Sequence, residues 1–441
     1  MAATHMLDKP GLKARRAAIS LLQGVTLDQL PLDQLLETDV EFAALEGRDR
    51  SFAHALVASS LRHGGEIKAV LGEFLKKPLP RSSGIAVDIL TVAVTQLLFM
   101  SVSPHAAIDL SVDLAKQDKK AQHFSGLINA VLRKISTAGK KTLESLDGPR
   151  LNTPDWLWEQ WVSAYGEATA HAIAAAHLVE APIDISVKDK ATHWATELAG
   201  ELLPTGSIRL SASDKSLVDM PGFSSGDWWV QDAASALPAK LFGDVKGQSV
   251  LDLCAAPGGK TAQLAAGGAS VTAVDDSVSR MARLRENLLR LKLPVSMILA
   301  DVLSLPTDVL YDNVLLDAPC SATGTIRRHP DLMYLKSQNQ LASLADLQLR
   351  MLTHAAELVR PGGQLIYCTC SLSPLEGERQ VFKFLRAHEN FVLKPVMPAE
   401  LGGQAQFVTP AGLLRCLPSM TIGNSAGLDG FFAARLQRLS A

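Results

Sequence analysis

Two cysteines lie where a reactive thiol could do chemistry. Cys320 ends the segment Asp317-Ala318-Pro319-Cys320, Cys370 ends the segment Cys368-Thr369-Cys370, and each segment closes an apolar run typical of a buried strand. A thiolate is a good nucleophile, so such a side chain could attack an electron-poor carbon. The stretch Ser373-Pro374-Leu375-Glu376 is typical of a capping box with proline at the first helical position. The positive end of that helix would favour the thiolate form of Cys370.

These thiols indicate a particular class of reaction. Carbon 5 of a pyrimidine is a poor nucleophile, but addition of a thiolate to carbon 6 turns it into an enamine carbon that can accept a methyl group. The reaction needs a thiolate, a group that holds the ring at N3, and a base for the proton on carbon 5. Cys370 suits the first role and Asp317 the second, with Cys320 one short turn beyond. We interpret Cys368 and Cys416 as small apolar side chains instead.

Carboxylates also gather at the ends of predicted strands. Asp275, Asp301 and Asp317 each end one of three successive strands, and the glycine-rich turn at residues 254–260 ends the strand before them. Asp275 suits a ribose diol, because one carboxylate can accept hydrogen bonds from both hydroxyls. The two glycines of the turn would let the backbone approach a ligand closely. One carboxylate at a strand end is often only a helix cap, but three at one sheet edge predict a binding crevice.

A phosphate-binding loop is the alternative for this turn. Gly259-Lys260-Thr261 after a strand is similar to the phosphate loop of NTPases, and residues 314–317 are similar to their magnesium-binding strand. That loop needs a glycine five residues before Gly259, where this chain has Cys254. Pro257 also removes one of the backbone N–H groups that such a loop donates to phosphate. The pattern therefore disfavours an NTPase.

The elements that must position these residues alternate regularly from residue 248 onward. We predict strands over 249–254, 270–275, 295–300, 312–317 and 364–370, with helices over 277–291 and 341–359 among them. Apolar strands separated by amphipathic helices are typical of a parallel, doubly wound sheet. Ligands of such sheets bind at the carboxyl ends of the strands, which is where the cysteines and carboxylates fall.

The rest of the chain has a different pattern. Residues 11–141 carry apolar side chains at three- and four-residue spacing, which indicates a helical bundle. Short strands near 183–187 and 208–211, with a helix near 192–198, indicate a small α/β insert. We therefore expect a multidomain chain, with an all-α domain over 6–141, a small α/β subdomain over 142–230, and a Rossmann-like α/β domain over 231–441.

Composition limits the classes of function. The 441 residues are 47% hydrophobic and 20% charged, with a net charge of −2, so any nucleic-acid partner must meet local basic patches. The five cysteines include no C-x-x-C pair, which disfavours a disulfide framework and a zinc site, and we predict no metal. The chain shows no membrane-spanning apolar run and no signal peptide pattern, so we expect a cytoplasmic protein without a membrane partner.

Basic residues gather late in the helical part. They are Lys116, Lys119, Lys120, Arg133, Lys134, Lys140 and Lys141. Such a cluster is either a solvated helix face or a face that contacts phosphates, and the pattern leaves both open. Arg327-Arg328-His329, just after the Cys320 segment, is also placed to meet phosphates around an extruded base.

Several of these segments together resemble a known family. Residues 251–261, 317–321, 369–371 and 429–432 look like the signature motifs of the Nol1/Nop2/Sun family of RNA cytosine-5 methyltransferases. Residues 124–133 are similar to the closing helix of the NusB fold, a helical RNA-binding domain. A NusB-like domain before a class I methyltransferase domain is the architecture of the bacterial Sun/Fmu/RsmB branch, which modifies 16S ribosomal RNA.

The resemblance implies a cofactor, a substrate and roles for individual residues. S-adenosyl-L-methionine would bind at Cys254, Ala255, Ala256, Pro257, Gly258, Gly259, Lys260, Asp275, Asp301 and Asp317. Cys370 would be the nucleophile and Cys320 the thiol that helps to resolve the covalent RNA adduct. Asp276 stands where the family more often has an apolar residue, which leaves open which carboxylate meets the ribose. The substrate would be 16S ribosomal RNA, and we expect a monomer because no coiled-coil or repeat pattern is present.

A non-catalytic protein is the alternative of a different class. A NusB-like RNA-binding factor could carry a methyltransferase fold that no longer works. Intact Asp317, Cys320 and Cys370 disfavour this alternative, because a retired site has no physical reason to keep two thiols near a carboxylate.

Overall fold

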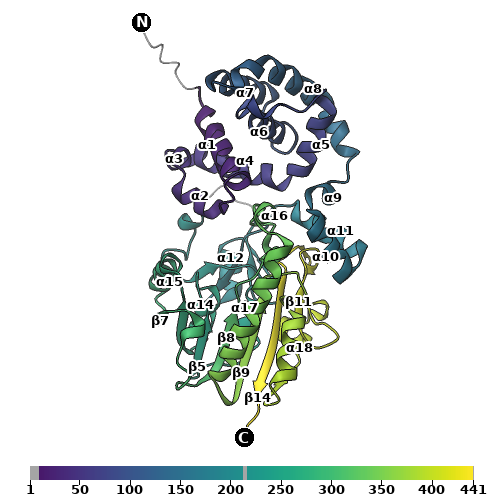
Figure 1. Ribbon diagram of the computed structural model, residues 1–441. Helices are drawn as coiled ribbons and strands as arrows, with labels where there is room; N and C mark the ends of the chain where they lie inside the picture. Colours follow the sequence, from purple (N-terminus) through teal and green to yellow (C-terminus); the bar gives the residue numbers. More distant parts are fainter. Residues whose placement is uncertain (1–8, 212–215, 441) are drawn as a thin grey trace. The chain divides into compact units, whose positions relative to one another are not determined.

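The computed structural model describes residues 9–211 and 216–440, drawn in Figure 1. The chain divides into two compact units. The N-terminal unit comprises Met1–Val162, Ala170–Val179 and Ile326–Lys336, and the C-terminal unit comprises Ser163–Thr169, Glu180–Thr325 and Ser337–Ala441. The predicted start of the first domain at residue 6 lies outside the described residues. The three-part division of the chain stays a proposal.

The N-terminal unit is helical, as predicted. Its core lies around α6 (Ala86–Leu98), on which Ile89, Leu90 and Val94 are buried. In α8 (Ser125–Glu144) the buried positions Ile128, Val131, Leu132 and Ile135 follow the three- and four-residue spacing of one helix face. The other helices are α1 (Leu12–Thr26), α2 (Leu32–Thr38), α3 (Val40–Ala43), α4 (Gly47–Arg62), α5 (Gly64–Phe74), α7 (Pro104–Gln117), α9 (Gly148–Asn152) and α16 (Leu332–Leu335). The helices α10 (Asp155–Tyr165) and α11 (Glu167–His177) each have residues in both units.

One segment distant in sequence belongs to this unit. Within Ile326–Lys336, the Asp331 carboxylate accepts a hydrogen bond from the Leu32 N–H at 3.0 Å. The Tyr334 hydroxyl donates to the Leu61 carbonyl at 2.8 Å, and Arg62 donates to the Arg327 carbonyl at 2.9 Å. Arg327 is only 3% exposed, so the prediction that its guanidinium meets RNA phosphates is wrong. From sequence alone, a long charged side chain that follows an apolar residue can lie either inside the protein or in solvent.

The C-terminal unit is built on one large sheet. Its strand order is β10-β14-β9-β8-β5-β6-β7, with β11 also paired to β14. The strands β5 to β9 run parallel, and β14 is antiparallel to β9. Their bounds are β5 (Ser249–Leu253), β6 (Ser270–Asp275), β7 (Ser296–Leu299), β8 (Tyr311–Asp317), β9 (Val359–Thr369), β10 (Phe391–Leu393), β11 (Leu414–Cys416) and β14 (Phe431–Arg438). The predicted Rossmann-like sheet is thereby confirmed.

Helices cover both faces of this sheet. The helices α17 (Gln338–Glu357) and α18 (Glu378–Ala387) pack on one face, which carries Leu316, Leu365 and Tyr367. The helices α13 (Leu237–Lys240) and α14 (Gly259–Ala266) pack on the other, which carries Leu315 and Ile366. In Figure 1, α17 and α18 lie over the long strands β8, β9 and β14. Buried strands with alternate residues facing two helical layers explain why the strand sequences are continuously apolar.

A second, smaller sheet precedes the large one in sequence. It is antiparallel with the order β2-β3-β1-β4, from β1 (Asp184–Val187), β2 (Glu201–Leu202), β3 (Ile208–Arg209) and β4 (Trp228–Val230). The helix α12 (Ala191–Glu197) packs with Ile185, Ile208 and Trp228. A buried pair, Arg209 Nε to Asp184 Oδ1 at 2.8 Å, links two of its strands. The remaining helix, α15 (Val278–Leu291), and the strands β12 (Thr421–Ile422) and β13 (Ser425–Ala426) also belong to this unit.

Candidate active site

The predicted site residues meet at the carboxyl edge of the parallel strands. A cavity of about 380 Å³ opens there, lined by Cys254, Asp275, Asp301, Asp317, Cys320 and Cys370 among others. It brings together the ends of β5, β6, β8 and β9 and the turn after β7. Asp276, Arg280, Leu347 and Met351 also line it. The sequence analysis considered Asp276 but missed the other three, which lie on α15 and α17 rather than at strand ends.

The glycine-rich turn shapes this cavity more than it lines it. Of residues 254–260, Cys254 is the one that lines the cavity, and its backbone takes a left-handed φ of 60°. Gly258 has a φ of 105° and precedes α14. A Cβ on Gly258 would come within 2.3 Å of Leu284 Cδ1, so glycine is needed here for packing against α15. That this glycine lets the backbone approach a ligand closely stays a prediction.

Asp275 is buried and strongly hydrogen-bonded. Its carboxylate accepts from the Ala256 N–H at 3.2 Å and the Ser277 N–H at 3.1 Å, and it pairs with Arg280 at 3.3 Å. Arg280 also donates to the Ala256 carbonyl at 2.5 Å, so it connects the turn after β5 with the end of β6. The neighbouring Asp276 is exposed to the cavity. Both carboxylates therefore line the cavity at the end of β6, and the prediction that one of them meets a ribose remains open.

Asp317 is held from two sides at the end of β8. Lys260 Nζ lies 2.7 Å from its Oδ2, and the Cys368 thiol donates to its Oδ1 at 3.5 Å. Burial lowers the pKa of Lys260, but the charge and hydrogen bond of Asp317, together with the other nearby acidic groups, outweigh burial and the pKa is raised. The Lys260 ammonium also lies 4.7 Å from the ring centre of Phe431, in the last of the recognised motifs. Lys260 thus forms an ion pair with Asp317 and does not line the cavity.

A further acid lies beneath the turn. Asp252 on β5 is fully buried, and the Thr261 hydroxyl donates to its Oδ2 at 2.6 Å. Burial raises the pKa of Asp252 to about 7, against the opposing effect of the Thr261 hydrogen bond. Asp301, by contrast, is exposed and accepts from the Leu303 N–H at 2.9 Å, as an N-cap does.

The two cysteines form a close pair. Cys320 Sγ lies 3.5 Å from Cys370 Sγ, both side chains are partly exposed, and both line the cavity. The pKa of Cys320 is raised well above its usual value, chiefly by the hydrogen bond with Cys370, with burial and the charge of Glu376 adding to the effect. The raised pKa favours the protonated form of Cys320, and either sulfur can be the donor in the contact between the two thiols.

Gly324 holds the loop of Cys320 against the loop of Cys370. Its N–H donates to the Cys370 carbonyl at 2.8 Å, and its carbonyl accepts from the Gly430 N–H at 2.8 Å. A Cβ at this position would lie 2.1 Å from the Gly430 oxygen and 2.7 Å from the Cys370 oxygen. Only glycine fits between these two strands of backbone.

The predicted capping box after Cys370 is wrong. The helix α18 begins at Glu378, and its N-cap is Gly377 with no side-chain hydrogen bond. The Ser373 N–H donates to the Ser371 hydroxyl at 3.0 Å, while the Glu376 carboxylate accepts a hydrogen bond from the Ser321 N–H. Cys370 is thus eight residues before the helix, and the proposed influence of the helix end on its thiolate has no structural basis. Tertiary donors compete successfully for a carboxylate that local spacing assigns to a cap.

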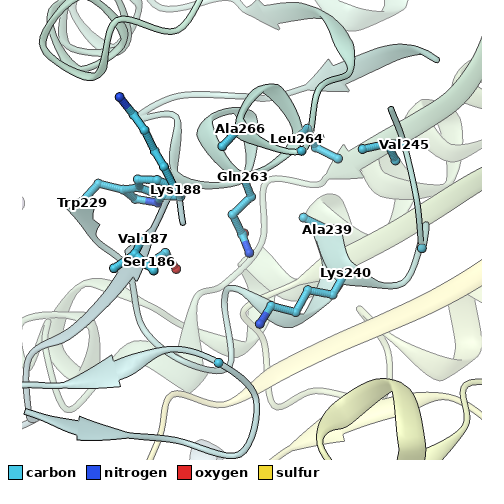
Figure 2. A pocket seen from close by; sticks show the side chains of 13 residues that line it. Ser186, Val187, Lys188, Trp229, Ala239, Lys240, Val245, Gln263, Leu264 and Ala266 are labelled. Atoms are coloured by element: carbon cyan, nitrogen blue, oxygen red, sulfur yellow. The ribbon is translucent and has the colours of Figure 1, made fainter. Parts of the chain in front are cut away.

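A second cavity of the C-terminal unit is distinct from this site. It has a volume of about 260 Å³ and is lined by Lys188, Trp229, Lys240 and Gln263 among others (Figure 2). Lys240 donates to the Thr205 carbonyl, and burial lowers the pKa of its ammonium. None of the predicted site residues lines this cavity.

Two further observations concern the described residues only. Over residues 9–211 and 216–440, no group of three or more His, Cys, Asp or Glu side chains is arranged to hold a metal ion. Over the same ranges, no helix has both the length and the apolar character needed to cross a membrane.

Comparisons with known proteins agree with this architecture. A family model described as 16S rRNA methyltransferase RsmB/F matches residues 240–437, and the NusB family model matches residues 12–137. Ribosomal RNA small subunit methyltransferase B of Pseudomonas syringae is 33% identical over 450 aligned residues, covering 98% of each chain. The protein of the same name from Vibrio cholerae is 34% identical over 376 residues, covering 81% of this chain and 86% of its own.

Solved structures show the same fold. The crystal structure of PH0851 matches with a TM-score of 0.74 at 25% identity, over 97% of this chain and 99% of that one. NSun6 from Pyrococcus horikoshii matches with a TM-score of 0.55 at 20% identity, over 65% of this chain and 99% of its own, which supports the fold alone. With a NusB domain followed by a Rossmann-like domain, the chain belongs to the RsmB/F family of 16S rRNA methyltransferases, which use S-adenosylmethionine.

Proposed function

We propose that this protein methylates carbon 5 of a cytosine in 16S ribosomal RNA through a covalent bond between Cys370 and carbon 6. The observation that carries the proposal is the thiol pair itself. Cys370 and Cys320 lie 3.5 Å apart and line the same cavity as the strand-end carboxylates. Methylation of a nitrogen or oxygen would need no thiol, whereas methylation of carbon 5 needs a nucleophile and a partner for its release.

The residues of the cavity fit S-adenosylmethionine. Carboxylates at the end of β6 suit the ribose hydroxyls, and Asp301 and Asp317 add further acceptors. Apolar side chains in the same cavity, Val302, Leu347 and Met351, suit a flat heterocycle. The cofactor supplies an electrophilic methyl group when bound. The turn at residues 254–260 would hold it chiefly through backbone shape, since Cys254 is the turn's one cavity-lining residue.

The side chains can be assigned to the steps of the reaction. The Cys370 thiolate forms a bond to carbon 6, and the electron pair of the 5,6 double bond moves to carbon 5, which becomes nucleophilic. Carbon 5 would then take the methyl group that bound S-adenosylmethionine would supply, and the electron pair of the broken sulfur–methyl bond would stay on the cofactor's sulfur. Asp317, paired with Lys260, accepts a hydrogen bond from the amino group of the base, or from N3 once that nitrogen carries a proton. Release requires loss of the proton on carbon 5 and departure of Cys370. Cys320 is the thiol within reach of both events.

We propose that the helical domain supplies much of the RNA affinity. The seven basic residues noted in the sequence are all exposed on α7, α8 and the turn between them. Lys116 and Arg133 also line a cavity of about 590 Å³ together with His105 and Asn129. Lysine and arginine at such a face bind phosphates, with an affinity that falls as salt concentration rises. We further propose that the protein acts as a monomer in the cytoplasm.

Label transfer from methyl-labelled S-adenosylmethionine to 16S ribosomal RNA tests the proposal. We expect transfer by the wild type, none by Cys370→Ala, and a denaturant-resistant protein–RNA adduct with Cys320→Ala. Undiminished transfer by Cys370→Ala would refute the mechanism. A non-catalytic RNA-binding factor would bind the RNA in all three forms and transfer no label in any.

A further inference from the structure

Glu376 is a buried carboxylate that the mechanism above does not use. It is fully buried, and its two oxygens accept four hydrogen bonds. The donors are the Ser321 N–H at 2.9 Å, the Ser321 hydroxyl at 2.5 Å, the Ser371 hydroxyl at 2.5 Å and the Gln348 amide at 3.0 Å. All four donors are neutral. A buried carboxylate that is satisfied by neutral groups alone costs stability, so its presence calls for another explanation.

The positions of the two serines supply that explanation. Ser321 directly follows Cys320, and Ser371 directly follows Cys370. Their hydroxyls lie 3.0 Å apart, and both contact the same oxygen of Glu376. One carboxylate therefore joins the residues immediately after the two thiols, across a separation of 50 residues in sequence.

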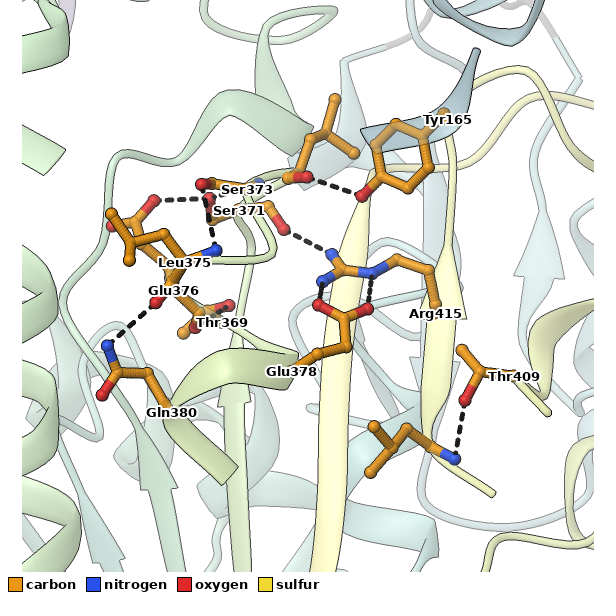
Figure 3. Close-up of polar contacts among 12 residues, drawn as sticks. Tyr165, Thr369, Ser371, Ser373, Leu375, Glu376, Glu378, Gln380, Thr409 and Arg415 are labelled. Atoms are coloured by element: carbon orange, nitrogen blue, oxygen red, sulfur yellow. Dashed lines mark hydrogen bonds and ion pairs between the residues drawn. The ribbon is translucent and has the colours of Figure 1, made fainter. Parts of the chain in front are cut away.

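Other side chains also contact the loops that carry Cys320 and Cys370. Gln348 on α17, besides contacting Glu376, donates to the Pro319 carbonyl at 2.9 Å, next to Cys320. Arg415 donates to the Ser371 carbonyl at 2.6 Å and pairs with Glu378 (Figure 3). The Tyr165 hydroxyl donates to the Leu372 carbonyl at 2.6 Å. Arg415 and Tyr165 contact the Cys370 loop only, whereas Glu376 contacts both loops.

We propose that Glu376 is a positioning residue that holds Cys320 and Cys370 at the separation needed to release the methylated RNA. This inference rests on the proposed function, because it assumes that Cys370 attacks and that Cys320 assists release. Glu376 touches neither the cofactor cavity nor a reacting atom, so it acts through Ser321 and Ser371. Its charge also contributes to the raised pKa of Cys320, after the hydrogen bond with Cys370 and burial, and so favours the protonated thiol.

The test compares Glu376→Gln in two backgrounds. In the otherwise wild-type enzyme we expect turnover to fall about 10- to 100-fold, as for other small misplacements of reacting groups, while the KM for S-adenosylmethionine changes less than about twofold. In the Cys320→Ala background, the measured rate is that of adduct formation. There we expect Glu376→Gln to change the rate less than about threefold, because the partner it positions is absent.

Matched variants separate positioning from a loss of structure. Glu400→Gln breaks a carboxylate contact with Arg435 in the same unit, away from the thiols, and should lower thermal stability without changing turnover. Ser371→Ala removes one donor to Glu376 and should reproduce the turnover defect in weaker form, even if Glu376→Gln folds poorly.

The outcomes distinguish this inference from the proposed function. Equal losses from Glu376→Gln in both backgrounds, or wild-type turnover by both Glu376→Gln and Ser371→Ala, would overturn the positioning role. Either result could accompany an inactive Cys370→Ala and a trapped Cys320→Ala adduct, and the proposed function would then stand. Methyl transfer by Cys370→Ala would instead refute the proposed function, and with it the positioning role of Glu376.

Discussion

The two ends of the candidate site hold their carboxylates in different ways. At the cofactor end, Asp275 pairs with Arg280, and Asp317 pairs with Lys260, so each charge has a cation beside it. At the thiol end, Glu376 is bound by two serines and a glutamine and has only neutral donors. An ion pair tolerates small displacements because Coulomb energy varies slowly with distance, whereas hydrogen bonds weaken steeply with geometry.

This difference matches what each end must do. Binding a cofactor requires complementary charge over several ångströms. In the proposed mechanism, release of an adduct on Cys370 with the help of Cys320 requires a fixed separation of the two sulfur atoms, here 3.5 Å. We therefore expect substitutions that displace the backbone to lower stability and turnover most at the thiol end. Substitutions that remove a charge should have their largest effects at the cofactor end.

The largest effect is expected from Gly324→Ala at the thiol end. The new Cβ would lie 2.1 Å from the Gly430 oxygen and 2.7 Å from the Cys370 oxygen, both of them backbone atoms that cannot move aside alone. We expect a loss of more than about 3 kcal/mol in unfolding free energy and little remaining turnover. Denaturant unfolding measures the first quantity. Gly126→Ala, with no heavy atom within 4 Å, is the control and should be neutral or slightly stabilising.

Asp252→Asn should change the pH dependence of stability at the cofactor end. The pKa of Asp252 is about 7 in the folded protein against a usual value of 3.8, so between these pH values the folded protein keeps a proton that the unfolded chain has lost. Unfolding free energy therefore falls as pH rises through that window, by roughly 2–4 kcal/mol. We expect Asp252→Asn to remove this fall in thermal unfolding between pH 4 and pH 8.

Asp312→Asn is the contrasting variant. Hydrogen bonds from Ser249 lower the pKa of Asp312, so its contribution is present at neutral pH and lost only in acid. Asp312→Asn should therefore keep the fall between pH 4 and pH 7. Identical pH profiles for Asp252→Asn and the wild type would show that Asp252 is not the group responsible.

Lys260→Met should leave the partly exposed Asp317 without its cation. We expect stability to fall by about 1–3 kcal/mol, since the lysine is buried but Asp317 remains partly solvated. Methyl transfer should fall at least about tenfold, because Asp317 loses the cation that holds its carboxylate in place for contact with the base. Exposed Lys246→Met is the control for loss of one positive charge. Unchanged transfer by Lys260→Met would remove Asp317 from the proposed mechanism.

The smallest effect is expected from Tyr165→Phe. The variant removes one hydrogen bond to the Leu372 carbonyl, and burial raises the pKa of Tyr165, so the lost donor is a neutral hydroxyl. We expect a loss of about 1 kcal/mol in stability and less than a threefold change in turnover. A larger defect in turnover than that of Glu376→Gln would show that the outer contacts, and not Glu376, position the Cys370 loop.

Much of this architecture could be predicted from the order of residues. The strands β6 and β8 end at Asp275 and Asp317 as the apolar runs predicted, and β9 ends at Thr369, one residue before the predicted Cys370. The carboxyl ends of parallel strands necessarily share one edge. The local sequence pattern predicted the wrong hydrogen-bond partner where a polar group had several possible partners. Ser373 and Glu376 have the spacing of a capping box, but Ser321 and Ser371 compete for the same carboxylate, and spacing cannot rank donors that are brought together by folding.

The sequence by itself determined that the chain combines an all-α domain with a Rossmann-like α/β domain, that the carboxylates lie at strand ends, and that two of the five cysteines are candidates for chemistry. These follow from periodicity and from chemistry, which are local properties. Only the tertiary structure decided that Arg327 is buried, that Gly258 makes room for Leu284, and that Glu376 joins the two thiol loops. Each of those depends on at least one contact between residues distant in sequence, such as Gly258 with Leu284, 26 positions apart, and Ser321 with Glu376, 55 positions apart, and such contacts exist only once the sheet and its helices have packed.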